Sequence, residues 1–178
     1  MEMITVDRAI RSELQEKKYA LISAEEFSFA PELVVDRQHL WADWDDLKLD
    51  NYLKDNGRFR QRRFGLFYML PSTGELLPLS PAAYIQTRKI NTYAGGIARK
   101  FAPLLEKTLT NQFLHDLIKF NFRQFPVDSS RTHQPWEIDV HQFRIVASQD
   151  EQGQPTPEGI HHDGDDFNCI HLIGRQNA

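Results

Sequence analysis

His161 and Asp163, in the stretch PEGIHHDG at 157–164, form the one His-x-Asp tripeptide of the chain. Side chains two residues apart on an extended backbone project to the same side, so this pair can hold one metal ion together. The chain has 7 His and 14 Asp among 178 residues. Random placement alone gives about 0.55 such tripeptides, so the competing interpretation is a polar turn. The surrounding elements must decide between the two.

Composition limits the class of protein. A chain of 178 residues with 40% hydrophobic residues can form one domain with a substantial core. The net charge of -4 and the absence of a long Lys/Arg cluster argue against nucleic acid or an anionic membrane as the partner. No stretch is long and apolar enough to span a bilayer, and no leader-like segment opens the chain. We therefore expect a soluble, cytoplasmic protein.

Two local patterns have simple structural interpretations. RFRQRRF at 58–64 alternates Arg with Phe, which predicts a strand with a solvated basic face. Cys169 is the single cysteine, so an internal disulfide and a multi-cysteine zinc site are excluded. Its setting in DFNCIHLIG predicts a small buried side chain on a strand.

The first part of the chain predicts helices. Val6, Ile10 and Leu14 repeat at helical spacing within 5–19. Ser23 and Glu26 are spaced for a capping box before a short second helix. Further helices are expected over 38–53, with the Asp-rich ADWDDLKLD as their solvated face, and over 103–122.

Strands are predicted elsewhere. Period-two character from 57 to 70, the turn residues PSTGE and then LLPLS indicate two antiparallel strands. WEIDVHQFRIVAS at 136–148 predicts a major strand, and DFNCIHLIG at 166–174 predicts another. The expected class is α+β, with helices outside the beginning of a β-sandwich or barrel.

The strand at 136–148 changes the character of its faces. On one face Trp136, Ile138 and Val140 are followed by Gln142 and Arg144, while the opposite face becomes apolar after His141. A β-bulge near His141 would keep the apolar face inward throughout. Alternatively the strand is regular, and Gln142 and Arg144 point into a polar pocket where a guanidinium binds a carboxylate.

WEIDVHQFRI, PEGIHHDGDDF and IHLIGRQN, in this order, resemble the iron and 2-oxoglutarate-dependent dioxygenases that hydroxylate free L-amino acids, the L-isoleucine dioxygenase and BsmA-like group. INTYAGGIARKFAPL at 90–104 is similar to the upstream part of that family. The resemblance covers roughly 55–178, within one domain over 1–178 whose residues 1–55 form a helical N-terminal part. It implies a double-stranded β-helix, a cupin-like jelly roll, with helices packed outside.

The resemblance also implies a site and a reaction. His161 and Asp163 would be two members of a two-His, one-carboxylate triad that binds Fe(II). His162 would project the other way, and Gln142 and Arg144 would line the substrate or cosubstrate pocket. The cosubstrates would be 2-oxoglutarate and O2, with one oxygen atom going to succinate formation and the other to an aliphatic C–H bond of an amino acid.

Two parts of the family pattern have no counterpart here. The family's second metal histidine and its 2-oxoglutarate-binding arginine lie several strands beyond the His-x-Asp, whereas the sequence has 15 residues after Asp163. By position, His171 is a wall residue with a local hydrogen bond, and Arg175 cannot take the oxoglutarate role. We therefore expect a truncated chain with an incomplete β-helix and open sheet edges.

Three interpretations stay open at this point. The first is an amino-acid hydroxylase, in full or truncated form. The second is a non-catalytic cupin-like module that acts in binding or in a stress response. The third, a calcium loop in HHDGDDF, lacks the ligand ladder and terminal Glu of an EF-hand. The particular amino acid and the oligomeric state are not encoded in any of these patterns.

If the missing ligands are essential, the 178-residue chain alone binds Fe(II) weakly and turns over no substrate. The measurement is succinate release from 2-oxoglutarate by the purified chain. Succinate formed faster than with free iron would contradict this expectation.

Overall fold

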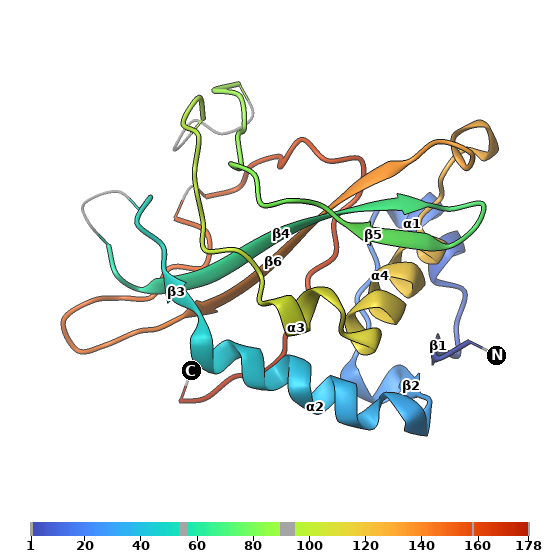
Figure 1. Cartoon of the computed structure of the whole chain (residues 1–178), viewed down its shortest axis with the longest axis horizontal. Coiled ribbons are helices and arrows are strands. Elements are labelled where there is room, and N and C mark those ends of the chain that lie inside the picture. The colour runs from blue at the N-terminus through green and yellow to red at the C-terminus, as the bar shows by residue number, and fades with distance from the viewer. Residues whose placement is uncertain (1, 54–56, 90–94, 158, 178) are drawn as a thin grey trace.

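Helices lie against one face of an antiparallel sheet in the computed structural model of the chain (Figure 1). The structure describes residues 2–53, 57–89, 95–157 and 159–177. Residues 90–94 of the block INTYAGGIARKFAPL and Glu158 of PEGIHHDG lie outside this range. The mixed helical and antiparallel architecture agrees with the predicted class.

β4 (Arg60–Leu70) is the central strand of the main sheet. Along one edge it pairs with β6 (Trp136–Ile145), and along the other with β3 (Lys48–Leu49) and β5 (Glu75–Pro78). The predicted pair of antiparallel strands is therefore confirmed. Gly74, at φ +70, closes the turn between β4 and β5, where its N–H donates to the Leu70 carbonyl at 2.9 Å.

The register between β4 and β6 is continuous. It runs from Arg60 opposite Ile145 to Met69 opposite Trp136 without an extra residue on either strand. The interpretation that places a β-bulge near His141 is therefore wrong, and the strand is regular. The polar pocket that the other interpretation places at Gln142 and Arg144 stays a prediction. Phe67 and Ile138 consequently share the face that packs on the helices, while Arg62 and His141 belong to the opposite face.

The helices are shorter and more interrupted than the periodicity predicts. The helical elements are α1 (Ile10–Lys17), η1 (Ala24–Glu26), η2 (Pro31–Leu33), α2 (Val34–Ala42), η3 (Asp43–Asp46), α3 (Glu106–Leu109), α4 (Gln112–Gln124) and η5 (Ser129–Arg131), where η marks a 3-10 helix. None of the described helices has the length and hydrophobicity needed to cross a membrane. The apolar face of α4 supplies much of the core, including Phe113, Leu117 and Phe120.

Local contacts explain these interruptions. The predicted helix over 5–19 loses its first turn because Ile4–Val6 form β1, which pairs with β2 (Phe27–Phe29), and it ends where Lys18 adopts φ 70. The predicted helix over 103–122 divides into α3 and α4, because the Asn111 side chain accepts the Leu114 N–H at 2.9 Å and begins a new helix.

The residues after Ser23 form the 3-10 turn η1. The Glu26 carboxylate accepts the Ser23 backbone N–H at 2.8 Å, which is the Glu side of the predicted capping box.

Several residues of the acidic and basic segments are buried, in contrast to the two predictions of wholly solvated faces. Asp43 and Asp50 are each 1% exposed, and the helix predicted over 38–53 ends before β3. Thr108 Oγ1 donates to Asp43 at 2.6 Å, and Arg60 Nε donates to Asp50 at 2.9 Å. A buried charge is costly without a partner, and for each of these carboxylates a hydrogen-bond donor from another element offsets that cost.

The segment after β6 contains no strand among its described residues. The strand predicted over 166–174 is therefore wrong, and Cys169 is exposed. The segment lies along the helices through isolated contacts, such as the Trp41 Nε1 donation to the Ile173 carbonyl at 3.2 Å. Ile170 and Leu172 are 84% and 80% exposed, so no neighbouring strand or layer covers this part of the segment.

The ion pairs of Asp50 generate a stability prediction. Asp50→Asn leaves Arg60 and Arg62 buried with less counter-charge, because Asp50 also lies 3.4 Å from Arg62 Nη1. We expect a loss of about 3 kcal/mol in the free energy of unfolding, measured by urea denaturation.

Asp45→Asn is the matched control, since Asp45 is 86% exposed and its Arg144 partner lies 3.5 Å away. It should cost less than about 0.5 kcal/mol. Equal effects of the two substitutions would contradict a special role of the buried pairs.

Candidate metal centre

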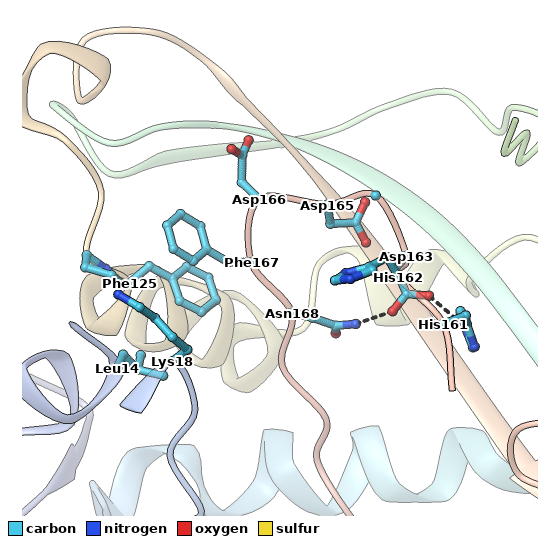
Figure 2. Close-up of a pocket in the computed structure, with 12 residues that line it drawn as sticks. Leu14, Lys18, Phe125, His161, His162, Asp163, Asp165, Asp166, Phe167 and Asn168 are labelled. Carbon is cyan, nitrogen blue, oxygen red and sulfur yellow. Dashed lines mark hydrogen bonds and ion pairs between the residues drawn. The ribbon is translucent and has the colours of Figure 1, made fainter. Parts of the chain in front are cut away.

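His161 and Asp163 converge in an irregular loop after β6. His161 Nε2 lies 3.1 Å from Asp163 Oδ1, so the pair that the sequence places two residues apart does meet through its side chains (Figure 2). Gly159 at φ +73 and Gly164 at φ +92 flank the pair. These left-handed conformations suit glycine and turn the backbone on either side of the two ligands.

Hydrogen bonds fix the direction of both side chains. His161 Nδ1 lies 2.8 Å from the Gly159 carbonyl, which can only accept, so Nδ1 carries a proton in this contact. The Asp163 carboxylate accepts the Asn168 side-chain N–H at 2.7 Å through its other oxygen, Oδ2. Such outer contacts set the tautomer and orientation of metal-binding side chains.

A consequence follows for the space between His161 and Asp163. With Nδ1–H directed to Gly159, the Nε2 lone pair of a neutral imidazole faces a carboxylate oxygen at 3.1 Å. Two acceptors at this distance need a cation between them or beside them, either a proton on Nε2 or a metal ion. Two cis ligands of a first-row ion lie about 3 Å apart, so the spacing fits a shared metal.

The donor set is incomplete among the residues that the structure describes. Within them, no group of three or more His, Cys, Asp or Glu side chains is arranged to hold a metal ion. His171 lies apart from the pair, because its Nε2 contacts the Asn121 side chain at 2.9 Å. This hydrogen bond is of the kind predicted for His171, although His171 is on no strand.

The loop is anchored on two sides. Toward the helices, Arg131 binds both carboxylate oxygens of Asp166 at 3.0 and 3.1 Å, and Phe167 stacks on Phe125 with ring centroids 4.5 Å apart. Toward the sheet, Gln86 Nε2 donates to the Asp163 carbonyl at 3.1 Å. The His-x-Asp pair is thus held between α4 and the polar face of the sheet.

A pocket of about 790 Å³ borders the loop (Figure 2). Its other walls come from Leu14 and Lys18 at the end of α1 and from Phe125 and Pro126 after α4. The volume is within the range of small-molecule sites, roughly 300–1,000 Å³.

The sheet face beside the loop is strongly basic and buried. Arg62 Nη2 lies 2.6 Å from His141 Nδ1, and its guanidinium lies 3.9 Å from the Phe101 ring centre. Burial, followed by the charge of Arg60, lowers the pKa of Arg62 to about 10. Burial together with the charges of Arg62 and Arg99 lowers the pKa of His141 to about 3, so His141 is neutral at physiological pH.

Gln142 and Arg144 lie on the opposite face of β6 from His141. Gln142 is 2% exposed, and neither amide atom of its side chain has a hydrogen-bond partner within the described part of the chain. Arg144 is half-exposed and pairs with Asp45. The described contacts do not bring these two residues to His161 and Asp163, and their predicted pocket role stays a prediction.

Sequence patterns did not identify several of the residues around the site. Gln86 lies 77 positions before Asp163, and Arg62, which is part of RFRQRRF, lies 79 positions before His141, so no local spacing joins either pair. The sequence offered one indication for His141: in a regular β6, the alternation of side chains places His141 and Gln142 on different faces of the strand. Asn168 follows Asp163 by five residues without a recognisable spacing rule.

Residues 42–178 match the 2OG-Fe dioxygenase family. This match covers most of the chain, so the chain belongs to that family, whose dioxygenase chemistry uses Fe(II), 2-oxoglutarate and O2. The predicted resemblance is thereby confirmed at the level of the family. The imidazole and carboxylate of the His-x-Asp pair are donors that suit Fe(II).

The solved structures that are similar to this chain include a bsmA homolog and IDO. A bsmA homolog from Methylobium petroleophilum PM1 is 30% identical with a TM-score of 0.63, over 74% of this chain and 52% of that one. IDO from Bacillus thuringiensis is 18% identical with a TM-score of 0.67, over 86% of this chain and 64% of that one, which shows a shared fold. The chain spans about half of the first structure's length and under two thirds of the second's. No curated protein matches the chain.

The acidic groups beside the loop generate a pH prediction. Burial raises the pKa of Asp139 from 3.8 to about 6, and the charges of Asp165 and Glu137 act in the same direction. Between about pH 4 and 6 the unfolded chain loses a proton that the folded chain retains, so stability falls as the pH rises through this window.

Asp139→Asn removes this loss and should raise the melting temperature at pH 7 but not at pH 4, measured by thermal denaturation at both pH values. Exposed Asp150 provides the control substitution Asp150→Asn, which should show no such difference. An Asp139→Asn effect of the same size at both pH values would argue against the shifted pKa.

Proposed function

We propose that this chain supplies the iron-binding His-x-Asp of an Fe(II)- and 2-oxoglutarate-dependent dioxygenase that hydroxylates a free L-amino acid, with an aliphatic side chain as the expected target. The observation that carries the proposal is the approach of His161 Nε2 to Asp163 Oδ1 with Nδ1 directed to Gly159. Family membership gives this geometry its chemical interpretation.

The residues of the chain would bind and orient. His161 and Asp163 would provide two of three metal ligands, and Asn168 and the Gly159 carbonyl would hold them in direction. When bound, Fe(II) with 2-oxoglutarate activates O2 for insertion into a C–H bond. Among the described residues, no third donor is clustered with His161 and Asp163.

The pocket gives support to a small-molecule substrate. The stacked Phe125 and Phe167 provide an apolar wall, while Lys18 and Asp165 provide charges of opposite sign. Charges of both signs near an apolar wall suit a zwitterion with an aliphatic side chain. An amino acid as substrate rests on this chemistry and on the sequence resemblance.

A non-catalytic cupin-like binding module is the second candidate. The absence of a third donor within the described residues favours it. Such a module would keep the fold without a need for the close contact between His161 and Asp163. Metal binding therefore separates the two candidates.

Anaerobic titration with Fe(II) in the presence of 2-oxoglutarate tests the proposal. We expect a visible metal-to-ligand absorption band in the wild-type chain and an affinity lowered by at least about tenfold in both His161→Ala and Asp163→Ala. His162→Ala is the control, because His162 takes no part in the contact between His161 and Asp163, and it should keep the wild-type affinity. No band in the wild-type chain at saturating Fe(II), or the same affinity in all variants, would contradict the proposal.

A further inference from the structure

The position of the His-x-Asp loop depends on side-chain contacts. Its described residues form no helix or strand, so no ladder of backbone hydrogen bonds holds them. Arg131 and Phe125 hold Asp166 and Phe167, at the far end of the loop. Gln86 contacts Asp163 itself, through the hydrogen bond from Nε2 to the Asp163 carbonyl at 3.1 Å.

Arg99 determines which way the Gln86 amide points. Arg99 Nη2 donates to Gln86 Oε1 at 2.7 Å, and a guanidinium has no acceptor atom. Oε1 must therefore face Arg99, which leaves the Nε2 donor directed at Asp163. Gln86 is 8% exposed and Arg99 is 3% exposed, so this arrangement is shielded from competing water.

Backbone contacts hold Gln86 and Arg99 in place. Tyr84 and Arg99 exchange two backbone hydrogen bonds, at 2.9 and 3.0 Å, and the Gly96 N–H donates to the Gln86 carbonyl at 2.7 Å. The Arg99 guanidinium also lies 4.7 Å from the Tyr84 ring centre. The donor that reaches Asp163 is thus part of a hydrogen-bonded framework on the polar side of the sheet.

We propose that Gln86, oriented by Arg99, is a positioning residue for the metal centre. Gln86 holds the backbone of Asp163 while Asn168 holds its carboxylate, so the ligand is fixed at both ends. Losing the first contact lets the loop move relative to the sheet and increases the entropy lost when the ligands bind a metal. The metal part of this inference rests on the proposed function, whereas the loop part does not.

Gln86→Glu is the sharpest test because the two side chains have nearly the same shape. The carboxylate still accepts from Arg99, which keeps it ionised. It has no N–H for the Asp163 carbonyl and repels that oxygen. Gln86→Met is the second variant, since it removes the donor without adding charge.

Gln124→Glu is the matched control. Gln124 Nε2 also donates to a backbone carbonyl, that of Phe120 at 3.3 Å, but this carbonyl belongs to α4 and not to the loop. The control therefore makes the same chemical change to the same kind of hydrogen bond.

The first readout is amide hydrogen exchange of residues 159–168 in the metal-free chain. Both Gln86 variants should exchange faster than the wild type in this segment, with unchanged exchange in β4 and β6, and Gln124→Glu should behave as the wild type there. Unchanged loop exchange in both Gln86 variants would overturn the positioning role. Faster exchange throughout β4 and β6 would also overturn it, since that result indicates general destabilisation.

The second readout is Co(II) affinity from absorption titration. Outer contacts of metal ligands are worth about 10- to 100-fold in affinity, so Gln86→Glu should lose a factor in this range. Faster amide exchange of the loop in Gln86→Glu, together with wild-type Co(II) affinity, would overturn the link to the metal centre. A wild-type chain that binds no Co(II) would contradict the proposed function, and the exchange result alone would then decide the positioning role.

Discussion

The unbroken pairing of β4 with β6 determines which side chains face the helices and which face the loop. A slip of one residue would exchange the two faces, placing Arg62 in the core and Phe67 on the polar side. The pairing is supported from the next layer, where Leu104 lies so close to Gly65 that an added Cβ would be 2.6 Å from its Cδ1. Phe64 exchanges backbone hydrogen bonds with Ala102 and Leu104, each at 3.0 Å, which holds that segment on the strand.

From this register follows the electrostatic character of the site. Arg60 and Arg62 share the buried Asp50, and burial together with the positive charge of Arg62 lowers the pKa of His141 and keeps it neutral. The loop brought against this region carries Asp163 and Asp165. Opposite charges on the sheet and the loop favour their association, and the Gln86 hydrogen bond gives that association a defined geometry.

Sequence patterns predicted the parts of the structure that depend on local spacing. The apolar face of α4, the β4–β5 hairpin and the convergence of His161 with Asp163 all follow from residues close together in the chain. The burial of Arg60 and Arg62 could not be predicted from local spacing, because it depends on the counter-charge of Asp50, which belongs to another part of the chain. The strand expected at 166–174 lacks a partner strand among the described residues. Asn111 divides the helix that periodicity alone predicts as continuous over 103–122. The contact of Gln86 with Asp163 joins residues 77 positions apart, beyond any spacing rule.

We propose that His161 and Asp163 bind one iron ion. A crystal structure of the chain grown anaerobically with Fe(II) and 2-oxoglutarate, with anomalous data collected at the iron edge, tests it directly. We expect a single strong anomalous peak about 2 Å from both His161 Nε2 and Asp163 Oδ1. A peak at other residues, or no peak that lies beside both His161 and Asp163 at full iron loading, would contradict it.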